Sequence, residues 1–140
     1  MIVYTPKNNK AYVIYSFDGI PMDKMGIMPL YVGYTIKNKI IIQPHLENDK
    51  ALLQHELTHV DQYNDYFCFH FRYNHYKDFR FKMEAEAFAA QLKKSEKDNR
   101  FEKLNAYSNE LSTKYNIDKS FEECRNLIMK FYGGKNDQNN

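Results

Sequence analysis

The first 45 residues alternate short runs of β-forming side chains with turn signals. Residues 10–17 are rich in β-branched and aromatic side chains and end at the turn pair Asp18-Gly19. Two further runs of this kind, 30–37 and 39–43, follow with a single asparagine between them. The pattern predicts a small N-terminal sheet with a hairpin, in which Ile40-Ile41-Ile42 is a buried strand or a strand at the edge of a cleft.

The spacing of apolar residues becomes helical after residue 48. Asn48 or Asp49 can cap a helix that extends to about residue 64. One side of this helix is apolar: Leu53, Leu57 and Val60. Another side is polar: His55, Glu56, His59 and Gln62. Each of two sides of this helix thus has its own type of side chain. A helix that carries a buried site needs this, whereas a solvated helix does not.

Three more helices are predicted after residue 80. The first covers about 81–97 and is rich in alanine, so it can approach a neighbouring helix closely. The next shows an apolar stripe between residues 101 and 115. The last begins at the capping-box pattern Ser120 to Glu123 and ends at Gly133-Gly134. We therefore expect an α+β fold with a small N-terminal β-sheet followed by about four helices, in one domain over residues 1–132 with a disordered tail over 133–140.

Residues 66–82 are aromatic and basic without a clean period, which predicts an irregular connection. Its four cations among the rings, Arg72, Lys77, Arg80 and Lys82, are a pattern found in proteins that bind single-stranded nucleic acid. Such a segment more often packs its rings on the core and leaves its charges in water. The net charge of +2 is also too small to imply a polyanionic partner. Nucleic acid is therefore not the expected partner.

The apolar segments and the cysteines bear on where the protein is located and whether it binds a membrane. The N-terminus lacks the uninterrupted apolar core of a signal peptide, and no segment has the length of a membrane span. We expect no membrane partner and a location in the cytoplasm of the cell or of a phage-infected host. The two cysteines, Cys68 and Cys124, form no C-x-x-C pair, and both are expected to pack as small apolar residues in a reducing compartment.

The pentapeptide His55-Glu56-Leu57-Thr58-His59 carries the most specific chemistry in the chain. Histidines four residues apart lie on one face of a helix, so both imidazoles can reach one zinc ion. Glu56 projects about 100° round the helix from His55, beside the metal, where a carboxylate can take a proton from water that the metal activates. The motif would arise by chance in roughly one such sequence in a hundred, and the alternative is a pair of surface histidines.

Two histidines leave a catalytic zinc ion short of one protein ligand. His70 and His75 belong to the irregular aromatic segment and are weaker candidates. Glu84 and Glu86 lie on the alanine-rich helix, and their side chains differ by about 200° around its axis, so only one of them can face a metal. The residues alone leave this choice open.

The segments HELTHVDQY and Glu84-Ala-Glu86-Ala87 resemble the gluzincin metallopeptidases, especially the small single-domain ones of bacteria and phages. The strand lead-in Gly33-Tyr-Thr35 and the tyrosines Tyr73 and Tyr76 also match the pattern of this family. The resemblance covers about residues 30–90. It implies a minimal zincin-like domain that hydrolyses peptide bonds in a protein or peptide substrate.

Position by position, the resemblance implies that His55, His59 and Glu84 bind Zn²⁺ and that Glu56 is the general base. The family also places an aspartate four residues after the ligand glutamate to orient a ligand histidine, and here that residue is Phe88. Support for the histidine must then come from a backbone carbonyl, Gln91 or Glu86. The candidates for stabilising an oxyanion are Tyr73, His75 and Tyr76.

The missing aspartate also leaves a second function open. The alternative is a catalytically weak or inactive zincin-fold module with a structural or binding role, for example a component of a phage virion. The sequence does not determine the oligomeric state or the substrate.

Overall fold

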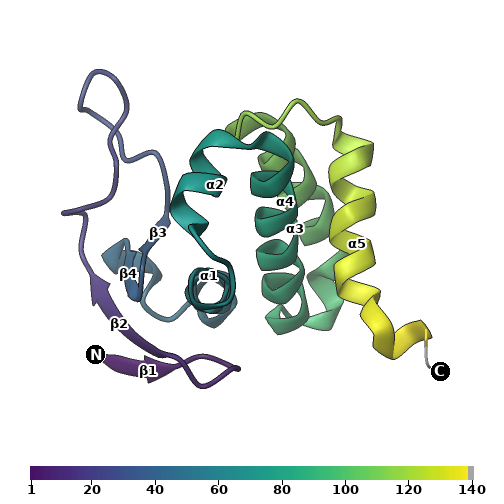
Figure 1. Cartoon of the computed structure of the whole chain (residues 1–140), viewed down its shortest axis with the longest axis horizontal. Coiled ribbons are helices and arrows are strands. Elements are labelled where there is room, and N and C mark those ends of the chain that lie inside the picture. Colours follow the sequence, from purple (N-terminus) through teal and green to yellow (C-terminus); the bar gives the residue numbers. More distant parts are fainter. Residues whose placement is uncertain (139–140) are drawn as a thin grey trace. The chain divides into compact units, whose positions relative to one another are not determined.

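The computed structural model describes the backbone of residues 1–138 and the side chains of residues 1–133. The chain is α+β, as the sequence predicts: a small four-stranded sheet is followed by five α-helices (Figure 1). The residues fall into two compact units, Met1–Phe67 and the part from Cys68 onward, and each unit has its own core. The expectation of a single domain stays a prediction.

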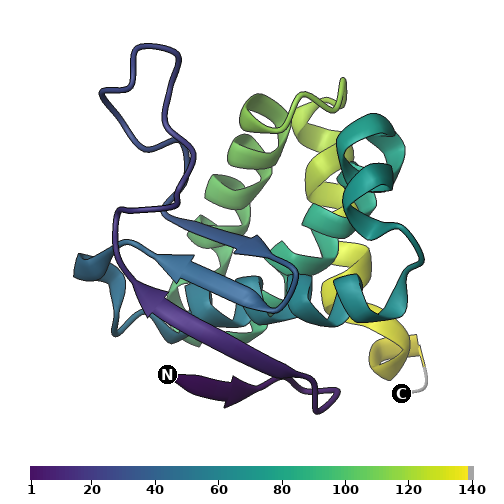
Figure 2. The same cartoon turned by 60° about the vertical axis from the view of Figure 1, so that its left-hand side comes forward.

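The sheet of the first unit is mixed. Its order is β1 (Ile2–Tyr4), β2 (Lys10–Tyr15), β4 (Lys39–Ile42) and β3 (Gly33–Ile36) (Figure 2). The central strands β2 and β4 are parallel, and both outer pairs are antiparallel. The predicted hairpin is therefore confirmed as β3 and β4, which are joined by a turn at Lys37, whose φ is 57°.

Strand β4 is buried on both faces, which explains its run of three isoleucines. Ile40 and Ile42 belong to the core between the sheet and the helix that follows. Ile41 lies against the loop after β2, because a Cβ at Gly19 would come within 2.7 Å of its Cδ1 atom. Gly19 also has a φ of +91°, so this close approach of loop and strand requires glycine.

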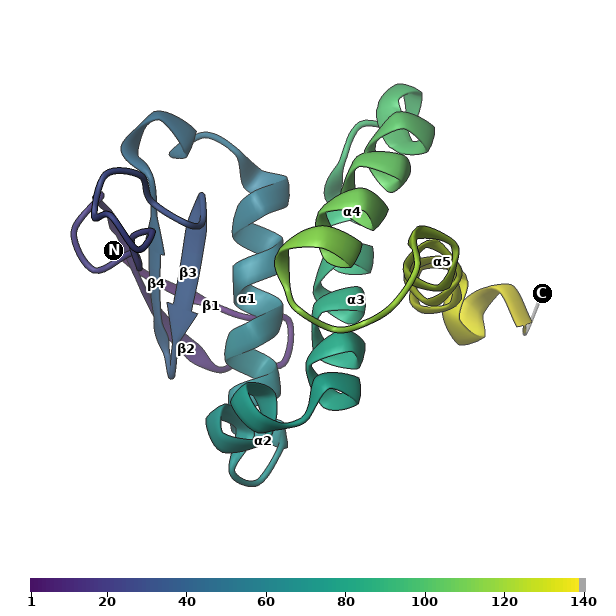
Figure 3. The same cartoon turned by 90° about the horizontal axis from the view of Figure 1, so that it is seen from above.

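Helix α1 (Lys50–Asp65) follows the short 3₁₀ helix η1 (Pro44–Leu46) and packs on β3 and β4 (Figure 3). Asp49 caps it by accepting a hydrogen bond from the Leu52 backbone N–H at 2.9 Å, one of the two caps expected. Alternate residues of β2 and β4 meet the apolar stripe of α1. The buried core they form is Ala11, Val13, Ile40, Ile42, Leu52, Leu57 and Val60.

The second unit contains α2 (Phe69–His75), α3 (Lys77–Lys94), α4 (Arg100–Lys114) and α5 (Phe121–Gln138), with the 3₁₀ helix η2 (Lys97–Asn99) before α4. Helices α3, α4 and α5 pack on one another. Their buried core is Ala85, Phe88, Ala89, Leu92, Leu104, Tyr107, Leu111, Ile117, Cys124 and Ile128.

The aromatic segment differs from the prediction, because residues 69–75 form α2 rather than an irregular connection. The helix is bounded by Cys68, which has a left-handed backbone conformation, and by Tyr76, which is extended. Phe69 is buried and its ring lies 5.8 Å from that of Tyr73 and 5.8 Å from that of Phe79. Seven residues give too little periodicity for a pattern to reveal a helix held by such ring contacts.

The capping box at the start of α5 is confirmed: the Glu123 carboxylate accepts from the Ser120 N–H, and the Ser120 hydroxyl accepts from the Glu123 N–H, both at 3.1 Å. The predicted end at Gly133-Gly134 is wrong, because α5 continues to Gln138. The disordered tail stays a prediction, and its residues 139–140 lie outside the described residues.

The two thiols have different environments. Cys124 is buried in the core of the second unit, as expected, but Cys68 is exposed, so its predicted packing is wrong. Over residues 1–138, no helix combines the length and the apolar character needed to cross a membrane.

Candidate metal centre

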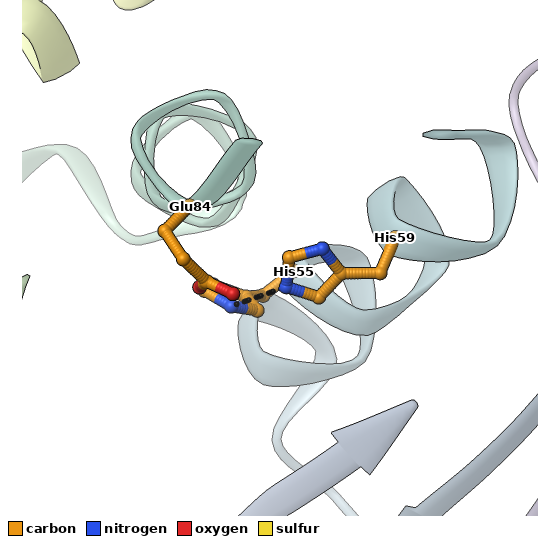
Figure 4. Close-up of side chains that lie close together, drawn as sticks. All are labelled: His55, His59 and Glu84. Carbon is orange, nitrogen blue, oxygen red and sulfur yellow. Dashed lines mark hydrogen bonds between the residues drawn. The ribbon is translucent and has the colours of Figure 1, made fainter. Parts of the chain in front are cut away.

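Helix α1 holds His55 and His59 one turn apart, and both side chains are buried, at 4% and 8% exposure. Their Nε2 atoms lie 3.2 Å apart, and their rings are nearly perpendicular, at 78° (Figure 4). Two nitrogens bound to one tetrahedral zinc ion at about 2.0–2.1 Å would be about 3.3 Å apart. The pair therefore has the spacing that two zinc ligands need.

The second nitrogen of His59 is held by Gln62. The Nδ1 atom lies 2.9 Å from Oε1 of Gln62, and since an amide oxygen only accepts, Nδ1–H is the donor. This tautomer leaves the lone pair on Nε2, the nitrogen that faces His55. Such support was expected from Gln91, Glu86 or a backbone carbonyl, and the structure shows it at Gln62. The signal was its position three residues after His59, which places both side chains on one helix face.

Glu56 points to the side, toward strand β3. Its side chain is buried, at 4% exposure, and its Oε1 accepts a hydrogen bond from the Thr35 hydroxyl at 2.7 Å. A Cβ added at Gly33 would lie 3.0 Å from Oε2, so glycine is what lets the carboxylate approach the strand. The Gly33-Tyr-Thr35 segment thus contacts the glutamate of the motif, a contact that no local sequence pattern predicts.

Glu84 lies on α3 and is buried, at 3% exposure, whereas Glu86 is only partly buried. The Tyr73 hydroxyl donates a hydrogen bond to Oε2 of Glu84 at 2.5 Å. Tyr73, one of the candidates for stabilising an oxyanion, thus contacts a carboxylate in this structure, and its role at an oxyanion stays a prediction.

The candidate ligand group is His55, His59 and Glu84, whose side-chain types suit a metal ion. Glu56 is not a member of this group. The histidines belong to the first unit and Glu84 to the second.

The other histidine candidates, His70 and His75, are not in this group and make ring contacts in α2 with Phe69 and Phe71. Two cations of this segment make hydrogen bonds or ion pairs within the second unit. The Arg80 guanidinium donates to several backbone carbonyls, and Lys77 pairs with Asp118 at 2.6 Å. Both charges therefore have structural partners, and the expectation that nucleic acid is not a partner stays a prediction.

The chain is α+β, and helix α1 of its first unit carries two buried histidines with the spacing that zinc ligands need. The sequence model of the eCIS core domain, a metallopeptidase-like family of extracellular contractile injection systems, matches residues 32–66. This match spans about a quarter of the chain, including β3, β4 and α1 with His55, Glu56 and His59. No curated protein and no solved structure matches the chain significantly.

Proposed function

We propose that the protein is a zinc-dependent metallopeptidase in which His55, His59 and Glu84 hold the ion and Glu56 is the general base. The observation that carries the proposal is the 3.2 Å separation of the two Nε2 atoms, with His59 fixed by Gln62 in the tautomer that binds a metal. Two imidazoles and one carboxylate are a common ligand set of catalytic zinc, which keeps a further position for water or substrate.

Glu84 is the third ligand in this proposal. Its burial and its hydrogen bond from Tyr73 favour it over Glu86, which is only partly buried. The Tyr73 hydroxyl holds Oε2, so Oε1 is the oxygen that we assign to the ion. Tyr73 then has the role that outer hydrogen-bond partners have at zinc sites, where they orient a ligand and tune its basicity.

Zinc in such a site polarises the scissile carbonyl and lowers the pKa of a water molecule toward neutrality. Glu56 accepts the proton of the attacking water and then passes it to the leaving amine. Its carboxylate suits this role because helix geometry places it about 100° round α1 from His55, and the Thr35 hydroxyl bonds to it. Both proton transfers then use one carboxylate that does not have to leave its position.

The substrate class in this proposal is a protein or peptide. Among the described strands, β3 is an outer strand of the sheet and contacts Glu56 through Thr35, so an extended peptide could add to its free side. Binding through backbone hydrogen bonds tolerates many sequences. The match to the eCIS core domain supports association of the protein with a phage-like particle or with the host cell that builds one.

The variant Glu56→Gln tests this function. We expect this variant to keep stoichiometric zinc and the fold. The Glu56 carboxylate contacts neither histidine, and glutamine has nearly the same size as glutamate. Turnover should fall by two to four orders of magnitude, which is about what a general base contributes. Elemental analysis gives the zinc content, and denatured casein and a fluorogenic peptide library give the rates. Equal rates for both proteins would show that Glu56 is not the base.

A second candidate function is a zincin-fold module without turnover, serving as a structural part of a particle. The match to the eCIS core domain over β3, β4 and α1 favours it, because that match includes no third ligand. Stoichiometric zinc with no cleavage of casein or of any library peptide would favour this module over the peptidase. Cleavage that depends on Glu56 would exclude it.

A further inference from the structure

We infer that Thr35 is a positioning residue that fixes the carboxylate of Glu56, and that Gly33 provides the space that this carboxylate occupies. The inference rests on the proposed function, because it concerns the group assigned as general base. It assigns a role to β3 beyond completing the sheet.

The contact joins two elements of the first unit. The Thr35 Oγ1 donates to Glu56 Oε1 at 2.7 Å and lies 3.4 Å from the Glu56 backbone carbonyl. Gly33 lies two residues earlier on the same face of β3, since side chains alternate along a strand. A Cβ at Gly33 would be 3.0 Å from Oε2, 3.2 Å from Cδ and 3.3 Å from Cγ of Glu56.

These contacts restrict a flexible side chain. Glutamate has three rotatable bonds, and a proton acceptor works only within hydrogen-bond reach of the proton that it takes. The α1 backbone is already fixed by the core residues Leu57 and Val60, so what remains free is the side chain of Glu56 itself. The Thr35 hydroxyl fixes Oε1 by a hydrogen bond, and Oε2 lies against the backbone at Gly33.

Thr35→Val removes the hydroxyl and keeps the size and the β-branched shape that a strand favours. We expect kcat on a fluorogenic peptide to fall by about 10- to 100-fold, the cost of a catalytic group displaced by about an ångström. KM and zinc content should not change, because Thr35 is not among the ligand residues. Thr35→Ser restores the donor and should return kcat close to that of the wild type. Thr113→Val, which removes an exposed hydroxyl bonded within α4, is the matched control.

Gly33→Ala tests the same geometry from the other side, because its methyl group would enter the space of the Glu56 carboxylate. Its kcat should also fall while zinc is retained. A readout independent of turnover is the binding of acetohydroxamate, a small zinc chelator whose acidic proton passes to a neighbouring base. Calorimetry should show weaker acetohydroxamate binding to Thr35→Val and Gly33→Ala than to Thr35→Ser.

The outcomes separate this inference from the proposed function. Wild-type kcat and acetohydroxamate affinity in folded Thr35→Val would overturn the role of Thr35, while a loss of turnover in Glu56→Gln would still support the peptidase. Wild-type rates in both Thr35→Val and Glu56→Gln would overturn the inference and the proposed function together. If Thr35→Val fails to fold, Gly33→Ala decides, and full kcat in that folded variant overturns the inference.

Discussion

Burial and hydrogen bonding distinguish the two glutamates of the segment Glu84-Ala-Glu86-Ala87. Glu84 is 3% exposed and accepts from Tyr73, whereas Glu86, two residues further along α3, is only partly buried. The sequence pattern left this choice open, and the resemblance alone favoured Glu84. A carboxylate that a tyrosine orients in a buried position is the better candidate for a metal ligand, because it would lose little conformational entropy on binding.

Glu84→Ala should therefore weaken zinc binding more than the 10- to 100-fold that loss of an outer supporting partner costs. Glu86→Ala is the matched control on the same helix, and its zinc affinity should stay near that of the wild type. Competition with a chromophoric chelator measures both affinities. Loss of zinc from Glu86→Ala with full retention in Glu84→Ala would show that the other helix face binds the ion.

Asp61 links helix α1 to the turn between β1 and β2 by hydrogen bonds. Its carboxylate is buried and accepts from the Thr5 hydroxyl, from Asn9 Nδ2 at 2.8 Å and from the Lys7 backbone N–H at 3.3 Å. Asp65, one helical turn further on, pairs with the Lys7 ammonium group at 2.5 Å on the surface. Both aspartates thus interact with the same turn, Asp61 through buried hydrogen bonds and Asp65 through an ion pair at the surface.

Asp61→Ala should lower the free energy of unfolding by about 2–3 kcal/mol, because it removes the acceptor of three hydrogen bonds, two of them made by Thr5 and Asn9 side chains. Asp65→Ala should cost less than about 1 kcal/mol, because an exposed ion pair contributes little. Urea denaturation followed by circular dichroism measures both values. Equal effects of the two substitutions would contradict the structural role of Asp61.

The two cysteines report on the folding of the second unit. Burial raises the pKa of the Cys124 thiol from an ordinary value of 9.0 to about 11, whereas Cys68 is exposed. Folding favours the neutral Cys124 thiol, so its contribution to stability is present below pH 9 and is lost as the pH rises from 9 to about 11. Only the thiolate reacts with disulfide reagents, and access to Cys124 requires opening of the core.

At pH 8, Ellman's reagent should therefore label one thiol per chain rapidly and the second only as the chain unfolds. Cys68→Ser should remove the rapid phase and leave the slow one. Absorbance at increasing urea concentration follows both phases. Two rapid thiols in the native protein would show that the core around Cys124 is open.

Contacts between residues close in the chain were predictable. The His55/His59 spacing, the Asp49 cap and the capping box at Ser120 each involve residues three or four apart, and a helix places such residues together whatever surrounds it. Helix α2 was missed because it is seven residues long and depends on ring contacts of Phe69. The exposure of Cys68 was missed because that residue lies at the break between two helices.

The sequence by itself determined the α+β class and the helix that carries the histidine pair, because the 2.0- and 3.6-residue periods of apolar side chains follow from backbone geometry. Only the tertiary structure decided the partners of the buried carboxylates. Thr35 and Glu56 are 21 residues apart in the chain, and Thr5 and Asp61 are 56 apart. No local period links such residues, because their contact depends on which strand packs on which face of α1.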